Sequence, residues 1–185
     1  MKTEIKNKKL KLWELDRLTE EEYSKKKKLP IVIVLDDIRS LNNIGSFFRT
    51  ADAFRVLKIY LCGITACPPH KDIHKTALGA TQNVDWEYFH SVLDLSLKLK
   101  ADGFQIISIE QAENTTLLNE YNSIQEPVAL FFGNEVNGVH QAVVDVSDFV
   151  LEIPQFGTKH SLNVSVCAGI VIWEFVKFFK LTKNI

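Results

Sequence analysis

The side chains best suited to chemistry follow a short extended segment near the C-terminus. That segment, residues 149–153, stops at Pro154 and Gly157, and a long apolar helix is expected to begin at Leu162. The helix opens with a dense group of polar side chains: Thr158, Lys159, His160, Ser161, Asn163 and Ser165. One or two such side chains would suffice to cap the free N–H groups of a helix start. The excess predicts a binding site.

A second loop, residues 131–139, follows a run typical of a buried strand. Gly133 and Gly138 bracket Glu135 there, and glycine lets the backbone approach a ligand closely. The loop lacks the Gly-Lys-Ser/Thr of a phosphate-binding loop, and the chain has no Gly-x-Gly-x-x-Gly fingerprint. Taken alone, the two glycines fit a simple turn better than a site.

A third loop, residues 36–43, leads into a helix predicted over residues 44–54. Asn42 or Asn43 can cap that helix, and Arg49 falls close to its buried face. Two interpretations of Arg49 remain open at this point. It is either an ordinary surface residue or a planar donor aimed at a phosphate or sugar.

Other constellations do not support a metal centre or a hydrolase. Cys67, His70 and His74 have roughly the spacing of zinc ligands, but no fourth ligand is evident. Asp36 and Asp37 are adjacent and are expected to diverge, which argues against paired-carboxylate hydrolysis. We therefore expect no metal, and we expect the three cysteines to be reduced and mostly packed.

The elements that must position these loops alternate between strands and helices. Continuous β-branched or apolar runs predict buried strands at residues 31–35, 58–62, 104–109, 128–132 and 149–153. Residues 84–89 are a weaker candidate for a strand. Helices are predicted at 44–54, 91–100, 139–146 and 162–180, the last apolar almost all round and so largely buried. This alternation predicts an α/β fold with a mainly parallel sheet flanked by helices. Ligands in such sheets bind beyond the carboxyl ends of the strands, where the three loops lie.

Composition limits the classes of protein that fit. The chain has 185 residues, 46% of them hydrophobic, and a net charge of −1, so any nucleic-acid contact must use local patches. No run is long enough to span a membrane and no signal peptide is present, so we expect a cytoplasmic protein. We divide the chain into a partly helical extension, 1–28, and one domain, 29–185. In the extension Thr19 and Glu22 form a capping box, and the basic run 25–28 is either a solvated helix end or a phosphate-contacting arm.

Together, and in this order, the three loops resemble the signature motifs of the SpoU (TrmH-like) branch of the SPOUT RNA methyltransferases. The matching segments are residues 43–54, residues 132–139, and residues 153–157 with 161–165. The resemblance covers about residues 30–180, and the small-residue segment 75–80 is also similar to one in the family.

The resemblance implies a fold with a deep C-terminal trefoil knot and a homodimer with its active site at the subunit interface. It implies methyl transfer from S-adenosylmethionine to a ribose 2′-hydroxyl of RNA. Because the basic extension is short, tRNA is favoured over rRNA as the substrate. The alternative is a non-catalytic RNA-binding protein with the same fold.

The resemblance also assigns the site. The residues that match cofactor-binding positions are Gly133, Ile153 and Leu162, with Glu110 in a loop that borders the same pocket. The residues that match the polar catalytic set are Asn43, Arg49, Glu135, Ser161 and Asn163. Since arginine does not lose its proton in proteins, we expect Arg49 to orient the phosphate and ribose, while phosphate or water accepts the proton. Glu135 is expected to anchor Arg49 or its own loop, and Ser161 and Asn163 to face the nucleotide.

Overall fold

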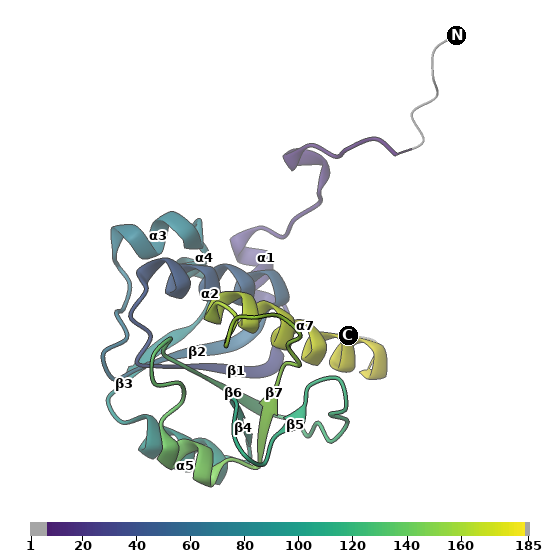
Figure 1. Cartoon of the computed structure of the whole chain (residues 1–185). Coiled ribbons are helices and arrows are strands. Elements are labelled where there is room, and N and C mark those ends of the chain that lie inside the picture. The colour runs from purple at the N-terminus through teal and green to yellow at the C-terminus, as the bar shows by residue number, and fades with distance from the viewer. Residues whose placement is uncertain (1–6, 184–185) are drawn as a thin grey trace.

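The computed structural model describes residues 7–183, and the side chains of the last helix as far as Phe179. Within this part of the chain seven strands form one sheet in the order β3-β2-β1-β6-β4-β7-β5, and all the paired strands run parallel (Figure 1). The strands are β1 (Leu29–Asp36), β2 (Val56–Cys62), β3 (Trp86–Phe89), β4 (Gln105–Ile109), β5 (Thr116–Leu117), β6 (Val128–Gly133) and β7 (Phe149–Glu152). The expected α/β fold with a mainly parallel sheet is therefore confirmed.

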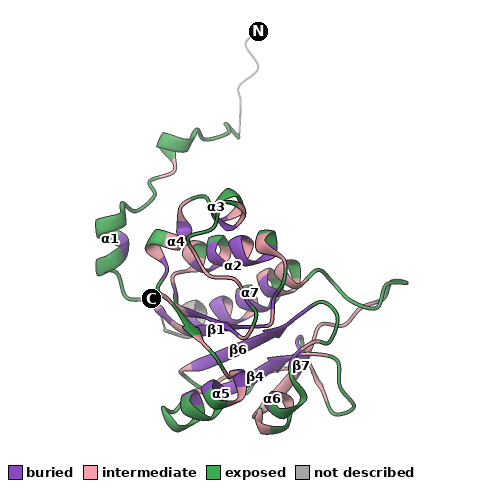
Figure 2. Ribbon diagram, turned by 90° about the vertical axis from the view of Figure 1, so that its left-hand side faces the viewer, coloured by how far each residue is buried: buried purple, intermediate pink, exposed green. Residues whose placement is uncertain are grey.

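Helices cover both faces of the sheet. One layer contains α2 and α7 with the short α3 and α4 beside α2, and the other contains α5 and α6 (Figures 1 and 2). The helices are α1 (Glu20–Lys25), α2 (Leu41–Phe54), α3 (Lys71–Ala77), α4 (Ala80–Asn83), α5 (Val92–Ala101), α6 (Gln141–Val146) and α7 (Val164–Lys183), with a 3₁₀ turn at Leu12–Glu14. Each layer buries its own apolar cluster against the sheet.

The central strands end at the same edge of the sheet. Asp36 of β1 pairs with Gly133 of β6, and Phe132 pairs with Ile109 of β4. Ile109 in turn pairs with Leu151 of β7. The loops after these strands are therefore brought together, although they lie up to about a hundred residues apart in the sequence.

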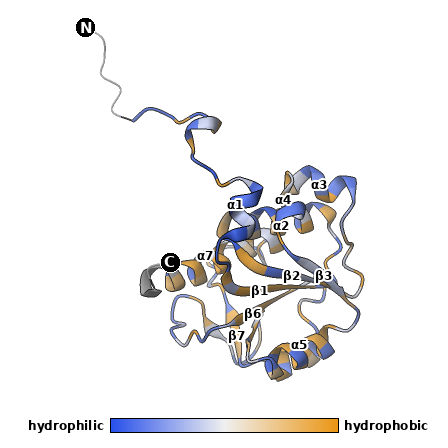
Figure 3. Ribbon diagram, turned by 180° about the vertical axis from the view of Figure 1, so that it is seen from behind, coloured by the Kyte–Doolittle hydropathy of each residue, from blue (hydrophilic) through white to orange (hydrophobic). Residues whose placement is uncertain are grey.

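Two details of the helices differ from the predictions. Helix α2 begins at Leu41, because the hydroxyl of Ser40 accepts the Asn43 N–H at 3.3 Å and so caps it. Asn43 thus lies inside the first turn, and its side chain is free for other contacts. Helix α7 is mostly apolar, and the part of it visible in Figure 3 is largely orange, but it is not buried all round as predicted: Val166, Ile170 and Trp173 are 52%, 39% and 49% accessible.

The N-terminal extension carries the predicted capping box. The Thr19 hydroxyl accepts the Glu22 N–H, and the Glu22 carboxylate accepts the Thr19 N–H at 2.8 Å. Helix α1 is short, and the segment before it runs away from the sheet (Figure 1). None of the helices in the described residues is long and apolar enough to cross a membrane.

Candidate active site

A cavity of about 580 Å³ opens at the carboxyl ends of β4, β6 and β7. Its walls come from four segments: the end of β4, the end of β6 with the loop after it, the end of β7, and the segment that enters α7. All four predicted cofactor-binding residues line it, namely Glu110, Gly133, Ile153 and Leu162. The sequence-based prediction placed these four residues at one pocket, and the structure brings them together there.

The loop after β6 folds back on itself without a side chain at its two glycines. A Cβ on Gly133 would lie 1.9 Å from the carbonyl carbon of Gly138, so only glycine permits this approach. Gly138 has a φ of +67°, and a Cβ there would lie 2.0 Å from the Glu110 carboxylate. The loop, whose glycines taken alone fitted a simple turn better than a site, is a closed turn that also forms one wall of the cavity.

Two side chains hold this turn in shape. The buried Asn134 accepts the N–H groups of Val136 and Asn137 at 2.9 and 2.8 Å. Glu110 accepts the Val139 N–H at 2.9 Å through one oxygen and the Gln111 N–H at 2.8 Å through the other. In this structure Glu110 therefore supports the wall of the cavity as well as lining it.

A chain of side-chain hydrogen bonds centred on Asn43 joins three distant segments. The Asn43 amide donates to the Glu135 carboxylate at 2.6 Å. Its carbonyl oxygen accepts from the Asn163 amide at 3.2 Å and from the Ser165 hydroxyl at 3.4 Å. Asn163 also caps α7, because its carbonyl oxygen accepts the Ser165 N–H at 3.0 Å. Asn43, Glu135 and Asn163, all predicted site residues, thus form one cluster at the cavity.

Ser165 belongs to this cluster, although it was not among the predicted site residues. The residue stands in the polar segment that drew attention to the site, two positions after Asn163. Its hydroxyl donates to Asn163 at 2.7 Å, so it fixes the cap as well as contacting Asn43. A hydroxyl side chain two residues after a capping asparagine commonly shares hydrogen bonds with the cap, and this spacing could have identified Ser165 from the sequence.

Arg49 lies outside this cluster. It is exposed on α2 and does not line the cavity of its own chain. Six residues of helix turn a side chain by about 600°, so Arg49 faces about 120° away from Asn43. Of the two roles expected for Glu135, anchoring Arg49 or anchoring its own loop, the structure supports the second, because Glu135 binds Asn43 and so ties its loop to α2. Ser161 is exposed and lines the cavity.

Cys167 lines the cavity one turn into α7, and burial raises the pKa of its thiol to about 12, with the Glu110 carboxylate adding to the effect. A thiol with so high a pKa is uncharged at neutral pH. Cys167 is therefore an apolar wall of the cavity and not a nucleophile.

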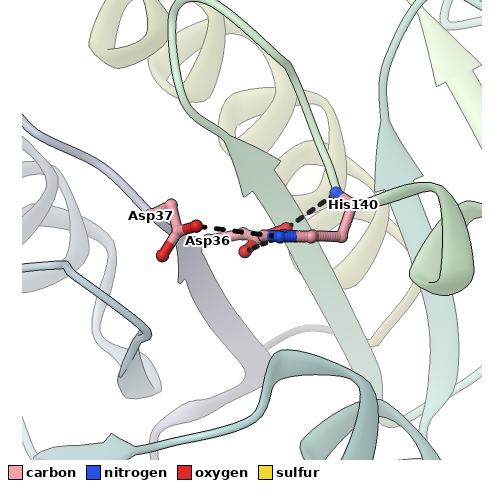
Figure 4. Close-up of side chains that lie close together, drawn as sticks. All are labelled: Asp36, Asp37 and His140. Atoms are coloured by element: carbon pink, nitrogen blue, oxygen red, sulfur yellow. Dashed lines mark hydrogen bonds and ion pairs between the residues drawn. The ribbon is translucent and has the colours of Figure 1, made fainter.

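A second polar cluster lies at the end of β1 (Figure 4). Asp36 is buried; one of its oxygens accepts the backbone N–H of His140, and the other is hydrogen-bonded to the imidazole Nδ1 of His140, both at 2.8 Å. Asp37 lies 3.7 Å from the other imidazole nitrogen, and its second oxygen accepts the Ile64 N–H. The two aspartates do not diverge as expected, because Asp37 follows the end of the strand with a φ of +56°. The cluster fastens the start of α6 to the sheet.

The buried position of Asp36 has an electrostatic effect. Burial raises the pKa of its carboxyl group, while the hydrogen bonds from His140 oppose that rise. The three groups have ligand atoms within 4.8 Å of one another. All the same, both oxygens of Asp36 are already engaged by His140, so this geometry is accounted for by protein contacts alone.

Comparisons with known proteins agree with the architecture and with the loops. Residues 30–173 match the model of the SpoU rRNA Methylase family. A tRNA (guanosine(18)-2′-O)-methyltransferase of Aquifex aeolicus is 29% identical over 159 residues, 83% of this chain and 72% of the relative.

Two solved structures are similar in fold. The TrmH/SpoU tRNA-modifying enzyme of A. aeolicus superposes with a TM-score of 0.78 at 27% identity, over 88% of this chain and 81% of that one. An AdoMet-bound rRNA methyltransferase from Sinorhizobium meliloti has a TM-score of 0.75 at 24% identity, over 86% of this chain and 59% of that one.

Proposed function

Because the chain belongs to the SpoU rRNA Methylase family, we propose that it transfers a methyl group from S-adenosylmethionine to a ribose 2′-hydroxyl of RNA. The observation that carries the proposal is the Asn43 cluster, which joins the three motif loops beside one cavity that two of its members, Glu135 and Asn163, line. A protein that had kept only the fold would have no need for polar side chains held in register there.

The cavity suits the cofactor. Apolar side chains from Ile109, Ile153 and Leu162 offer walls for an adenine ring, and the glycine turn exposes backbone groups beside them. The cavity of about 580 Å³ falls within the range of small-molecule sites. When bound, S-adenosylmethionine supplies an electrophilic methyl group on a positively charged sulfur.

The protein side chains then have two tasks. Asn43, Asn163 and Ser165 form a rigid polar surface that fixes the ribose, because each amide is already oriented by a neighbour. Positioning should contribute much of the rate, since the reacting oxygen must be held close to the methyl carbon and in line with it.

We infer that Arg49 completes the site of a partner subunit. It faces away from Asn43, and it lies on α2, which packs against α7 beside the exposed apolar stripe of Val166, Ile170 and Trp173. An apolar stripe of this kind on a helix is typical of a surface that pairs with another chain. A homodimer formed through α7 would bury the stripe and bring each Arg49 toward the opposite cavity. There its guanidinium would orient the RNA phosphate.

The substrate within this class is tRNA or rRNA, and we favour tRNA. A relative with a tRNA substrate in its name aligns over most of this chain. An enzyme of this kind would act in the cytoplasm, where both RNAs are found. The trefoil knot, the assignment of residues 29–185 as one domain and the role of each site residue remain predictions.

The test is direct. Purified protein is incubated with isotope-labelled S-adenosylmethionine and either bulk tRNA or bulk rRNA, and the nucleosides are analysed by mass spectrometry. We expect labelled 2′-O-methylnucleosides from one RNA pool, and none with Asn43→Ala. Calorimetry should show that the wild-type protein binds S-adenosylmethionine. Absence of cofactor binding would instead favour the non-catalytic RNA-binding alternative.

The role of Arg49 across the dimer has its own test. Co-expressed Arg49→Ala and Asn43→Ala chains form mixed dimers. If Arg49 acts across the interface, one site of each mixed dimer is intact, because it combines the native Asn43 of one chain with the native Arg49 of the other. If Arg49 acts within its own subunit, neither site is intact. With random pairing of a symmetric dimer, about a quarter of wild-type transfer should return. Each variant alone should be inactive. If each variant alone is inactive and the mixture stays inactive, Arg49 acts within its own subunit; an active Arg49→Ala protein would show that Arg49 is not needed. Arg49→Lys should restore little, because lysine lacks the planar fork.

A further inference from the structure

A second cavity, of about 520 Å³, lies at the edge of the sheet away from the cofactor cavity, and the two share no lining residue. It is formed by the start of α3, by α4 and by the first residue of β3. Its lining residues are Pro68, Pro69, His70, Lys71, Ile73, His74, Thr81, Gln82 and Trp86, and we call it the base pocket.

The base pocket is rich in flat side chains. The indole of Trp86, the imidazoles of His70 and His74 and the rings of two prolines all line it. Trp86 is partly buried and packs against the core, which holds its ring in place, while His74 is exposed. Aromatic and imidazole rings are the surfaces on which single-stranded RNA bases stack.

Polar groups of the base pocket are free to bind a ligand. The side chains of Lys71, His74, Thr81 and Gln82 make no hydrogen bond or ion pair to the described residues, 7–183. A base offers donors and acceptors on its edge, and a phosphate beside it is an anion. Asp72 and Asp85 are the nearby acids, and Asp72 lies 4.0 Å from His70. Lys71 and Lys75 are exposed on α3, where their ammonium groups can contact RNA phosphates.

The position of α3 connects the base pocket to the catalytic edge. The Thr76 hydroxyl donates to the Asn42 carbonyl at 3.1 Å, so the end of α3 contacts the first turn of α2 beside Asn43. The α3 residues that line the pocket, Lys71, Ile73 and His74, precede Thr76 by two to five residues, about 3 to 8 Å along a helix. That span corresponds to roughly one or two stacked nucleotides, at about 3.4 Å each.

We propose that the base pocket binds a nucleobase of the RNA strand a few nucleotides from the methylated ribose. The inference rests on the proposed function, because it takes RNA to be the substrate. It adds a second contact, chemically different from the cofactor cavity, through which the enzyme selects unpaired RNA next to its target.

The experiment uses the full chain and a fluorescent single-stranded octaribonucleotide of mixed sequence, with bulk tRNA as a second probe. His74→Ala removes one stacking surface, and His90→Ala, an exposed histidine outside the pocket, is the matched control. We expect His74→Ala to raise the Kd for both RNAs at least about 5-fold, as for the loss of one stacked base. His90→Ala should stay within twofold of wild type, and neither change should alter the Kd for S-adenosylmethionine.

A photocrosslink provides the second measurement. An octaribonucleotide with one 4-thiouridine should crosslink to the peptides that contain His74 or Trp86. Equal RNA affinity in His74→Ala and His90→Ala, or crosslinks found only elsewhere, would overturn the proposal. Such a result with wild-type methyl transfer intact leaves the proposed function standing and points to a protein or peptide as the occupant. Absence of methyl transfer by the wild-type protein would count against the proposed function instead.

Discussion

Asn43 is the residue on which three segments of the chain meet. Its amide donates to Glu135 and accepts from Asn163, so both of its polar atoms are used. The Glu135 partner is charged, and hydrogen bonds to a charged group are about twice as strong as those between neutral groups. The orientation of the Asn43 amide is therefore set mainly by Glu135.

That asymmetry gives a prediction for Glu135→Gln. The change keeps the shape of the side chain but removes the charge, and either end of the amide can then face Asn43. We expect methyl transfer, measured as kcat/KM on the RNA substrate, to fall about 5- to 30-fold, the effect of losing about 1 to 2 kcal/mol of a charge-assisted bond. Glu113→Gln, an exposed change outside the cavity, is the control. Equal activity in the two variants would show that the Asn43–Glu135 bond is not needed.

Cys167 gives a prediction about chemical reactivity. Because burial raises its pKa to about 12, only about one thiol in ten thousand is ionised at pH 8. The thiolate is the species that reacts with iodoacetamide. At pH 8 we expect alkylation of Cys167 in the folded protein to be at least about 100-fold slower than in urea. Peptide mass spectrometry measures both rates, and equal rates would contradict the burial.

At the scale of elements, the parallel strands and their order along the chain could be predicted from the sequence. Runs such as residues 31–35 are apolar at every position, because both faces of these strands are covered by helices. The short elements α3, α4 and β5 were missed. They have seven, four and two residues. Segments this short show too few repeats of a hydrophobic pattern to be distinguished from a loop.

The site was predictable to a similar degree. Motif order identified the loops, and the parallel sheet required them to meet. The partner of Glu135 was not predictable, because the start of α2 depends on whether Ser40 or a following asparagine caps it. A shift of one or two residues turns the Asn43 side chain to another face of the helix. The exposed side of α7 was also missed, since an almost wholly apolar helix has no periodicity to show which face a partner covers.

The cap of α7 gives a prediction at this scale. Asn163→Ala removes a helix cap and a hydrogen bond to Asn43, so we expect a loss of about 1 to 2 kcal/mol in the free energy of unfolding. Ser91→Ala removes the cap of α5 on the opposite face and should cost a similar amount. Urea unfolding measures both.

Cofactor binding separates the two caps. Asn163 lines the cavity and Ser91 does not, so only Asn163→Ala should weaken the binding of S-adenosylmethionine in calorimetry. A similar loss of affinity in both variants would show that general stability, and not the geometry of the α7 start, controls the cavity.

For the whole molecule, the exposed stripe on α7 is the feature that remains unexplained by a single chain. Val166, Ile170 and Trp173 face solvent on a helix whose other side is buried. In a dimer these side chains would be buried, which contributes about 25 cal/mol of favourable free energy for each Å² of apolar surface removed from water. The proposed composite site needs the same contact.

We therefore expect Ile170→Glu to convert the dimer into monomers and to reduce methyl transfer by more than tenfold, because a buried unpaired carboxylate is strongly unfavourable at an interface. Leu97→Glu is the matched control, since Leu97 is 48% exposed on α5, on the opposite face of the sheet. Light scattering and the transfer assay measure the two effects. The dimer proposal fails if Ile170→Glu remains dimeric and active, or if the wild-type protein is a monomer under active conditions.

The bonds from Asn43 to Glu135 and Asn163 also set an order of events during synthesis. Asn43 leaves the ribosome 92 residues before Glu135 and 120 residues before Asn163. Strands β1 and β2 are complete well before then, but the hydrogen-bonded cluster must wait for the start of α7. A chain that ends before Asn163 lacks a member of the cluster, so the proposed site cannot assemble until synthesis is almost complete.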